Sequence, residues 1–225
     1  YKQWDFKQVN QYLVSYKDTY NKKLFIVPTT EVDEELPMVK IPYNLGAVPR
    51  WIFDRQFTKQ TMKKWNCGVS AANGLIIPVH DKAVRTVGWI TRQEKQIPKY
   101  LYSRGLKKSH VLFGQPHVQK TNYVCVTEGP LDTMWLDQLG FPSVALLGMS
   151  MSEKQRDLLL TLPTNELILC LDNDEAGQRG LKRAMSLLGN KIKVSYINIP
   201  KEYKDVQDIK SYDILNKVIK NKRYW

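Results

Sequence analysis

The sequence has little cysteine and no long hydrophobic run. Among its 225 residues are three cysteines, at 67, 125 and 170, with no close pair. This number and spacing argue against a disulfide framework and against a C-x-x-C zinc site, so we expect a reducing cytoplasm. Because Cys125 and Cys170 lie inside apolar runs, we expect these two to be buried thiols. The longest apolar stretches, such as residues 142–149, fall well short of the roughly 18 residues that span a bilayer. The sequence therefore predicts a soluble protein with no zinc and no membrane partner.

The composition is typical of a globular protein. Hydrophobic residues make up 43% and charged residues 25% of the chain, which allows a core and argues against disorder or collagen-like repeats. At about 150 residues per domain, the length allows one domain or two small lobes. The chain starts at Tyr1 without a signal-peptide pattern, so we expect a piece of a longer chain rather than a secreted precursor.

Positive charge is concentrated in the first half. Residues 1–121 hold 20 Lys and Arg against 9 Asp and Glu, whereas residues 122–225 hold 14 against 13. A basic half predicts a binding surface for a polyanion, either nucleic acid or nucleoside triphosphate. General solubility charge is the alternative, although it normally mixes both signs.

The first half has a mixed secondary-structure pattern. We expect a helix at 6–16 and then irregular chain, because prolines recur up to residue 49. Thr58 is a candidate N-cap for a short basic helix at 59–65. The β-rich runs 75–79 and 85–91 predict a hairpin. We therefore divide this half into an N-terminal extension or linker, 1–50, and a basic subdomain, 51–121.

After residue 122, short apolar strands alternate with amphipathic helices. The expected strands are 123–126, 143–147, 166–171 and 193–199, and the expected helices are 131–139, 152–161 and 176–188. This alternation predicts βαβ units around a mainly parallel sheet, with ligands beyond the carboxyl ends of the strands. We take 122–225 as one domain with a helix at its C-terminal end.

Acidic side chains follow three of these strands where each strand ends. They are Glu128 and Asp132 after the first, Asp172 and Asp174 after the third, and Asp205 and Asp208 after the fourth. Taken singly, Glu128 as a turn residue or Asp132 as a partner of a helix dipole would be ordinary. Carboxylates that converge repel one another unless a cation lies between them, and hard divalent ions prefer oxygen ligands. The ordered set therefore predicts a magnesium site.

These motifs resemble a known family. Glu128-Gly-x-x-Asp132 followed by Asp172-x-Asp174-x-x-Gly177 resembles the Toprim fold of primases, topoisomerases and related nucleases. Upstream, the segments 74–81, 87–92, 97–103 and 112–114 resemble the RNA-polymerase core of bacterial and bacteriophage DNA primases. The similarity runs from about Phe53 to Ile219. It is closest to the primase half of phage helicase-primases, because residues 108–114 and Lys204-Asp-x-x-Asp208 follow the phage spacing.

The resemblance implies both a fold and an activity. The fold would be α/β: a Toprim domain with a mainly parallel central sheet flanked by helices, preceded by a smaller basic α+β subdomain. The activity would be DNA-directed synthesis of short RNA primers from ribonucleoside triphosphates by two-metal nucleotidyl transfer during DNA replication. A phage protein would act in the host-cell cytoplasm.

The resemblance also assigns roles to residues. Glu128, Asp172 and Asp174 would be catalytic, and together with Asp132, Asp205 and Asp208 they would hold Mg²⁺, for which Mn²⁺ could substitute. Arg92 and Lys99 match basic positions of the polymerase motifs and would hold triphosphate oxygens, with Lys107 and Lys108 as weaker candidates. Single-stranded DNA template would follow the basic helix with Lys59, Lys63 and Lys64, with Trp65, Tyr100 or Tyr102 available for base stacking.

Two parts usual in the family have no counterpart in this sequence. No Cys/His set could form the zinc-binding module that reads the template, and no Gly-x-x-x-x-Gly-Lys-[Ser/Thr] motif of a helicase occurs. We expect both, in cis or in trans, as partners. The alternatives are a metal-dependent nuclease of the Toprim class and a non-catalytic nucleic-acid-binding module of the replisome. A type IA topoisomerase would need a catalytic tyrosine domain that is not evident here.

Overall fold

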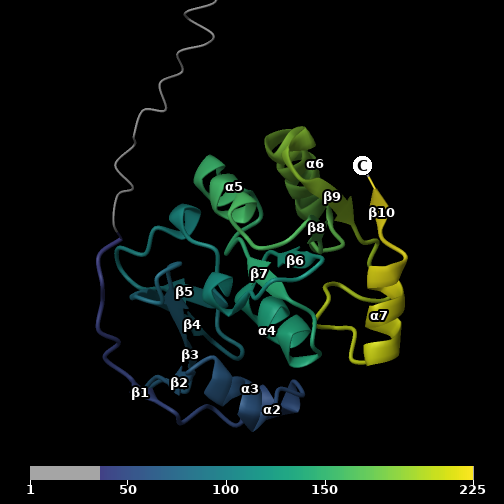
Figure 1. The fold of residues 1–225 in the computed structure, drawn as a ribbon. Helices are drawn as coiled ribbons and strands as arrows, with labels where there is room; N and C mark the ends of the chain where they lie inside the picture. The colour runs from purple at the N-terminus through teal and green to yellow at the C-terminus, as the bar shows by residue number, and fades with distance from the viewer. Residues whose placement is uncertain (1–35, 225) are drawn as a thin grey trace, which may run out of the picture. The chain divides into compact units, whose positions relative to one another are not determined.

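The computed structural model describes residues 36–224, which contain two five-stranded sheets (Figure 1). The first sheet has the order β1-β2-β3-β4-β5 and is antiparallel throughout. The second has the order β10-β9-β8-β6-β7 and is parallel except for β10. This is the predicted α/β fold, with a mainly parallel sheet preceded by a smaller α+β part. The helix expected at 6–16 lies outside the described residues.

The antiparallel sheet is built around the predicted hairpin. Its strands are β1 (Asn44–Leu45), β2 (Gly68–Val69), β3 (Leu75–His80), β4 (Thr86–Arg92) and β5 (Tyr100–Tyr102). The chain turns between β3 and β4 at Asp81, whose carboxylate accepts the backbone N–H groups of Ala83 and Arg85 at 2.9 and 3.0 Å. The short strands β1, β2 and β5 have no alternating apolar pattern, and the sequence did not predict them. β1 falls within residues 1–50, which were expected to form an extension.

Two short helices, α2 (Trp51–Asp54) and α3 (Lys59–Lys64), connect β1 to β2. The predicted N-cap of α3 is confirmed, because the Thr58 hydroxyl accepts the backbone N–H of Thr61 at 3.0 Å. The other end of α3 is held by Asp137, which lies in the second half of the chain. The Asp137 carboxylate accepts hydrogen bonds from Lys64 at 2.6 Å and from the Trp65 indole at 3.0 Å. The basic helix is therefore fixed to the rest of the chain at both ends.

The second half of the chain forms the predicted strands and helices. In chain order its elements are β6 (Val124–Thr127), α4 (Pro130–Gln138), β7 (Ser143–Ala145), α5 (Glu153–Leu160), β8 (Glu166–Leu169), α6 (Glu175–Leu188), β9 (Lys193–Tyr196), α7 (Tyr212–Lys220) and β10 (Arg223–Tyr224). β7, β8 and β9 end earlier than predicted. The apolar runs extend further because Leu146 and Cys170 stay buried beyond the last strand residue, where their N–H groups still donate to the carbonyls of Thr127 and Val126 at 3.0 and 2.8 Å.

Helices cover both faces of the parallel sheet (Figure 1). On one face, Val124 and Val126 of β6 belong to a buried cluster with Leu159 of α5 and Ala184 of α6. α4 lies on the other face, where the hydroxyl of Thr133 in α4 is 2.8 Å from the hydroxyl of Thr127 in β6. Because successive strand residues point to opposite faces, the continuous apolar run of β6 supplies both cores.

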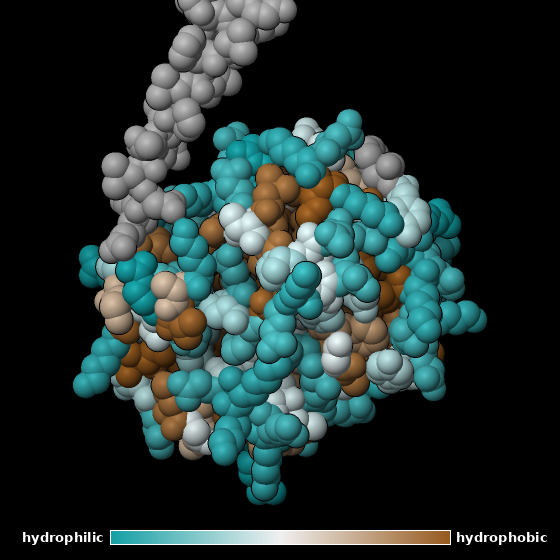
Figure 2. Space-filling view, viewed as in Figure 1, coloured by the Kyte–Doolittle hydropathy of each residue, from teal (hydrophilic) through white to brown (hydrophobic). Residues whose placement is uncertain are grey.

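The surface and the cysteines agree with the composition. Hydrophilic residues cover most of the face seen in Figure 2, and hydrophobic residues appear between them in separate patches. Cys125 and Cys170 are free and buried, as predicted, and Cys67 is free and buried too. No helix between residues 36 and 224 combines the length and the apolar character needed to cross a membrane.

Candidate active site

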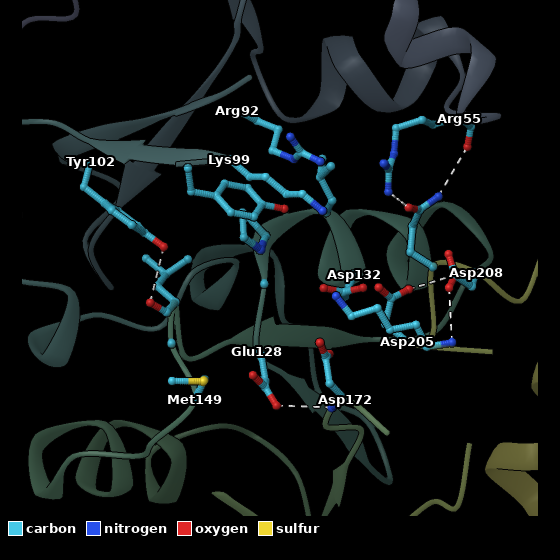
Figure 3. Close-up of a pocket in the computed structure, with 18 residues that line it drawn as sticks. Arg55, Arg92, Lys99, Tyr102, Glu128, Asp132, Met149, Asp172, Asp205 and Asp208 are labelled. Carbon is cyan, nitrogen blue, oxygen red and sulfur yellow. Dashed lines mark hydrogen bonds between the residues drawn. The ribbon is translucent and has the colours of Figure 1, made fainter. Parts of the chain in front are cut away.

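A pocket of about 330 Å³ lies where the carboxyl ends of the parallel strands face the antiparallel sheet (Figure 3). It contains seven of the predicted site residues, which come from both sheets. They are Arg92, Lys99, Glu128, Asp132, Asp172, Asp205 and Asp208. The structure thus brings together acidic and basic side chains that are widely separated in the sequence.

The ends of β6 and β8 meet through Glu128 and Asp172. The carboxylate of Glu128 accepts the backbone N–H of Asp172 at 3.2 Å. β6 and β8 are adjacent parallel strands, so the residues that follow them emerge at the same edge of the sheet. The arrangement is the one that the strand pattern predicts.

Gly177 makes this edge compact. A Cβ atom on Gly177 would lie 2.1 Å from the carbonyl oxygen of Asp172, which leaves no room for a side chain. The Asp174 carboxylate accepts the backbone N–H of Gly177 at 2.8 Å and so caps α6. Asp174 is exposed and is not among the residues that line the pocket.

The third acidic segment is a turn that is closed by its own carboxylates. Asp205 accepts the backbone N–H of Asp208 at 2.9 Å, and Asp208 accepts that of Lys204 at 3.1 Å. The carbonyl of Lys204 in turn accepts the N–H of Asn173 at 2.9 Å. These bonds fix the turn beside the end of β8, where Asp205 and Asp208 enter the pocket.

Crowding raises the pKa values of the carboxyl groups. Burial, followed by the charge of Asp172, raises the pKa of Glu128 to about 7. Burial, followed by the charge of Asp205, raises the pKa of Asp172 to about 6. Burial and the charge of Asp205 also hold the pKa of Asp132 well above its usual range. Burial and mutual repulsion thus both disfavour the ionised carboxylates, against the opposing charges of Lys204 and Arg55.

Basic side chains form the opposite wall. Arg92 is 5% exposed, and its guanidinium carbon lies 5.1 Å from the centre of the Tyr100 ring. Its Nε atom is buried without a hydrogen-bond partner in the described structure, while one of its terminal nitrogens donates to the carbonyl of Gln93. An arginine placed in this way keeps donors available for an anion.

Arg55 is a pocket residue that the sequence analysis missed. It donates a hydrogen bond to the side-chain oxygen of Gln207, which also lines the pocket. Its positive charge lowers the pKa of both Asp132 and Asp205 against the stronger effect of burial. The resemblance covers Arg55, but no motif that we quoted includes it, so no signal marked it.

Other predicted residues do not line the pocket, although Lys108 lies beside it. Lys107 and Lys108 are exposed next to β5, and the ammonium group of Lys108 lies 4.2 Å from the centre of the Tyr102 ring. Lys59, Lys63 and Lys64 are exposed on or beside α3. Trp65 is only 4% exposed and stacks on Phe113, which argues against the predicted base-stacking role for its ring.

The donor set suits a hard divalent cation. The acidic wall offers carboxylate oxygens, and burial together with neighbouring carboxylates raises the pKa values of Glu128 and Asp172, so a cation bound there would favour their ionised forms. In the part of the chain from 36 to 224, no three His, Cys, Asp or Glu side chains converge closely enough to hold one ion by themselves. A Mg²⁺ ion commonly binds through one or two carboxylates and keeps several waters, so paired carboxylates are sufficient.

Comparison with known proteins identifies the second half of the chain. Residues 125–210 match the Toprim-like family. The chain therefore contains a Toprim-like domain. This match includes every acidic residue of the pocket and also Lys204, whereas Arg55, Arg92 and Lys99 come from the segment that precedes it.

The chain is also similar to curated DNA primases. The chain is 34% identical over 142 residues to the DNA primase of Rickettsia bellii, a match that covers 57% of this chain and 24% of that protein. The chain thus spans about a quarter of the length of this relative.

Solved structures of primases share the fold. The DnaG primase catalytic domain bound to single-stranded DNA aligns with a TM-score of 0.67 and 20% identity, over 78% of this chain and 71% of that one. The primase fragment of the bacteriophage T7 primase-helicase aligns with a TM-score of 0.64 and 21% identity, over 85% and 84%.

Proposed function

We propose that this chain is the catalytic core of a DNA primase, which synthesises short RNA primers on single-stranded DNA from ribonucleoside triphosphates. In the reaction, a primer 3′-hydroxyl oxygen bonds to the α-phosphorus of the incoming nucleotide. The bond from that phosphorus to the bridging oxygen breaks, and pyrophosphate leaves. The similarity to a DNA primase sequence and to a primase catalytic domain supports this activity.

One observation carries the proposal. The acidic wall, centred on Glu128 and Asp172, faces the basic wall of Arg92 and Lys99 across a single pocket. A triphosphate needs cationic donors for its oxygens, and the reacting phosphorus needs a nearby metal-binding carboxylate set. Both requirements are met within the same cavity.

Glu128, Asp132, Asp172, Asp205 and Asp208 would hold the metal, with Mg²⁺ as the expected ion and Mn²⁺ as a substitute. Bound metal would activate the attacking hydroxyl and neutralise charge on the leaving pyrophosphate. Arg92 and Lys99 would orient the triphosphate, and Arg55 joins them in this role. Asp174 is kept in the proposal as a supporting residue, because its charge raises the pKa of Glu128 and of Asp172 even though it caps α6.

The two parts of the chain would divide the work. Residues 51–121 would hold template and triphosphate, and residues 122–225 would carry the metal-binding carboxylates. We propose the exposed Lys59, Lys63 and Lys64 as template phosphate contacts and Lys107 and Lys108 as weaker anion contacts. The proposed partners are a zinc-binding template-reading module and a replicative helicase. The similar primase fragment of a phage primase-helicase supports the helicase as a partner. A cytoplasmic location follows from this role.

Primer extension tests the proposal. The chain is incubated with Mg²⁺ or Mn²⁺, labelled ribonucleotides and a single-stranded DNA carrying an annealed RNA primer, which removes the need for a zinc module. Template-directed lengthening of the primer is expected, and EDTA should stop it. Shortening of the DNA would instead indicate a nuclease, and binding without either reaction would indicate a replisome module.

A further inference from the structure

One end of the pocket, which we call the apolar end, is lined by Met149 and by Tyr102, although the ammonium group of Lys108 lies 4.2 Å from the centre of the Tyr102 ring. Met149 and Tyr102 lie at this end, away from Asp208 and Arg55 at the other (Figure 3). The side chain of Met149 is 61% exposed although it is large and hydrophobic. A single exposed apolar residue is common on protein surfaces, but this one lines a pocket whose other walls are charged.

The backbone that carries Met149 is firmly held. Leu147 has a φ of 57°, in the left-handed region that non-glycine residues rarely adopt, and its carbonyl accepts the Tyr102 hydroxyl at 3.5 Å. A Cβ atom on Gly180 of α6 would lie 2.5 Å from the carbonyl oxygen of Met149, so helix and loop are in direct contact.

The other end of this loop is held as well. Arg183 donates to the carbonyl of Met151 at 3.1 Å, and Met151 itself is buried. Gln155 donates to the carbonyl of Leu146 at 2.7 Å. These contacts hold the backbone on both sides of Met149, whose side chain lines the pocket, and a fixed backbone is a requirement for a binding contact.

We propose that Met149, next to Tyr102, forms the contact surface for the ribose and base of the incoming nucleotide. This inference rests on the proposed function. Arg92 and Lys99 take the triphosphate, so the uncharged part of the same ligand must lie elsewhere in the pocket. The apolar end is the surface that suits a flat aromatic base, and a thioether packs well against aromatic rings.

A contact through Met149 would not select one nucleotide base over another. A methionine side chain has no hydrogen-bond donor and only a weak acceptor, so it cannot distinguish one base edge from another. Contact through the face of a base tolerates all four bases. Met149 would therefore add affinity for every ribonucleotide equally and leave the choice of base to pairing with the template.

Direct binding measurements test this inference. Calorimetry compares the four ribonucleoside triphosphates and inorganic tripolyphosphate on the wild-type chain and on Met149→Ser. We expect Met149→Ser to weaken each of the four nucleotides by roughly threefold to tenfold, the effect of losing one apolar contact. Binding of tripolyphosphate should not change, because Met149 does not contact phosphate.

Two further variants serve as matched controls. Met149→Leu restores the apolar contact and should bind nucleotides as the wild-type chain does. Met38→Ser removes another exposed methionine, 69% exposed and outside the pocket, and should also leave binding unchanged.

Several outcomes would overturn the inference. Wild-type nucleotide affinity in Met149→Ser would do so, as would equal weakening of tripolyphosphate, which would indicate a distorted loop. Weakened binding of single-stranded DNA alone would assign Met149 to the template. If the wild-type chain bound neither nucleotides nor tripolyphosphate, the proposed function would fail first, and this inference with it.

Discussion

Glu128 accepts a hydrogen bond from the backbone N–H of Asp172 at 3.2 Å, across 44 residues of chain. The two residues follow adjacent parallel strands, β6 and β8, so the sheet itself brings them together. With Asp205 close enough to raise the pKa of Asp172, the ends of three strands share one charged pocket. This relationship is the basis of the proposed metal-dependent chemistry.

Asp172→Asn should abolish primer extension and leave template binding intact. The loss should be about 100-fold or more, because metal-assisted charge stabilisation contributes several kcal/mol. Without metal, this variant should be more stable than the wild-type chain by about 1 kcal/mol, since it removes repulsion within a half-buried cluster. Extension assays and thermal unfolding in EDTA measure the two effects. Asp157→Asn changes a carboxylate outside the pocket and is the control; normal extension by Asp172→Asn would reject the role.

Arg92→Ala should raise the KM for ribonucleotides more than it weakens binding of single-stranded DNA. The physical reason is that a guanidinium with free donors in the pocket contacts the triphosphate rather than the template. An increase of about tenfold in KM is expected from loss of a charge-assisted hydrogen bond. Arg104, exposed and outside the pocket, offers a matched control. An unchanged nucleotide dependence in Arg92→Ala would remove this assignment.

Gly177→Ala should destabilise the fold at the metal-binding edge. The added Cβ atom would lie 2.1 Å from the carbonyl oxygen of Asp172 and would force the strand end and the helix apart. A cost of about 2 kcal/mol or more in the free energy of unfolding is expected. Gly148→Ala is the comparison, because a Cβ atom there meets nothing within 4 Å, and its cost should stay within about 0.5 kcal/mol. Equal stability of the two variants in urea unfolding would contradict the close packing.

Glu166, which does not line the pocket, should make the free energy of unfolding depend on pH. Its carboxylate accepts the Ser195 hydroxyl at 2.6 Å and lies 3.1 Å from the ammonium group of Lys222. Burial raises the pKa of Glu166, but the Ser195 and Lys222 contacts outweigh burial, so the pKa is below its ordinary value. A lowered carboxyl pKa stabilises the fold above the unfolded-state pKa of about 4.3, and this stability is lost as the pH falls through the folded-state value.

The variant Glu166→Gln isolates this contribution. It should cost about 1–2 kcal/mol at pH 7, where a charge-assisted hydrogen bond is lost. The difference from the wild-type chain should shrink as the pH falls from about 5 to 3, because the wild-type carboxyl group is then protonated too. Urea unfolding at several pH values measures it. A difference that stays constant over this range would show that the ionised carboxylate is not what stabilises the contact.

The parallel half of the fold could be predicted from the sequence, and so could the acidic wall. The strands around Val124 and Leu167 are short apolar runs between amphipathic helices, a pattern that specifies βαβ units. Because the carboxyl ends of parallel strands lie at one edge of the sheet, the sequence alone predicts that Glu128 and Asp172 lie close together. The predicted helix starts were also close, since Pro130 and Ser152 are local start signals.

The other features depend on tertiary contacts that have no local signal. Asp174 satisfies the motif for a metal ligand and equally the preference for a helix N-cap, and spacing alone cannot separate these roles. Trp65 follows three lysines and suggested a template surface, but its indole packs on Phe113, which is distant in sequence. Arg55 reaches the pocket only because Gln207 orients it, a contact across 152 residues.

The most direct test of the central claim is Mn²⁺ binding followed by electron paramagnetic resonance. If paired carboxylates at the three strand ends hold neighbouring ions in the same pocket, the wild-type chain binds Mn²⁺ saturably. Glu128→Gln, Asp172→Asn and Asp205→Asn should each weaken this same binding by at least about tenfold, the effect of losing one carboxylate ligand. Wild-type affinity in any of the three variants, or no saturable binding by the wild-type chain, would contradict a shared metal-binding pocket.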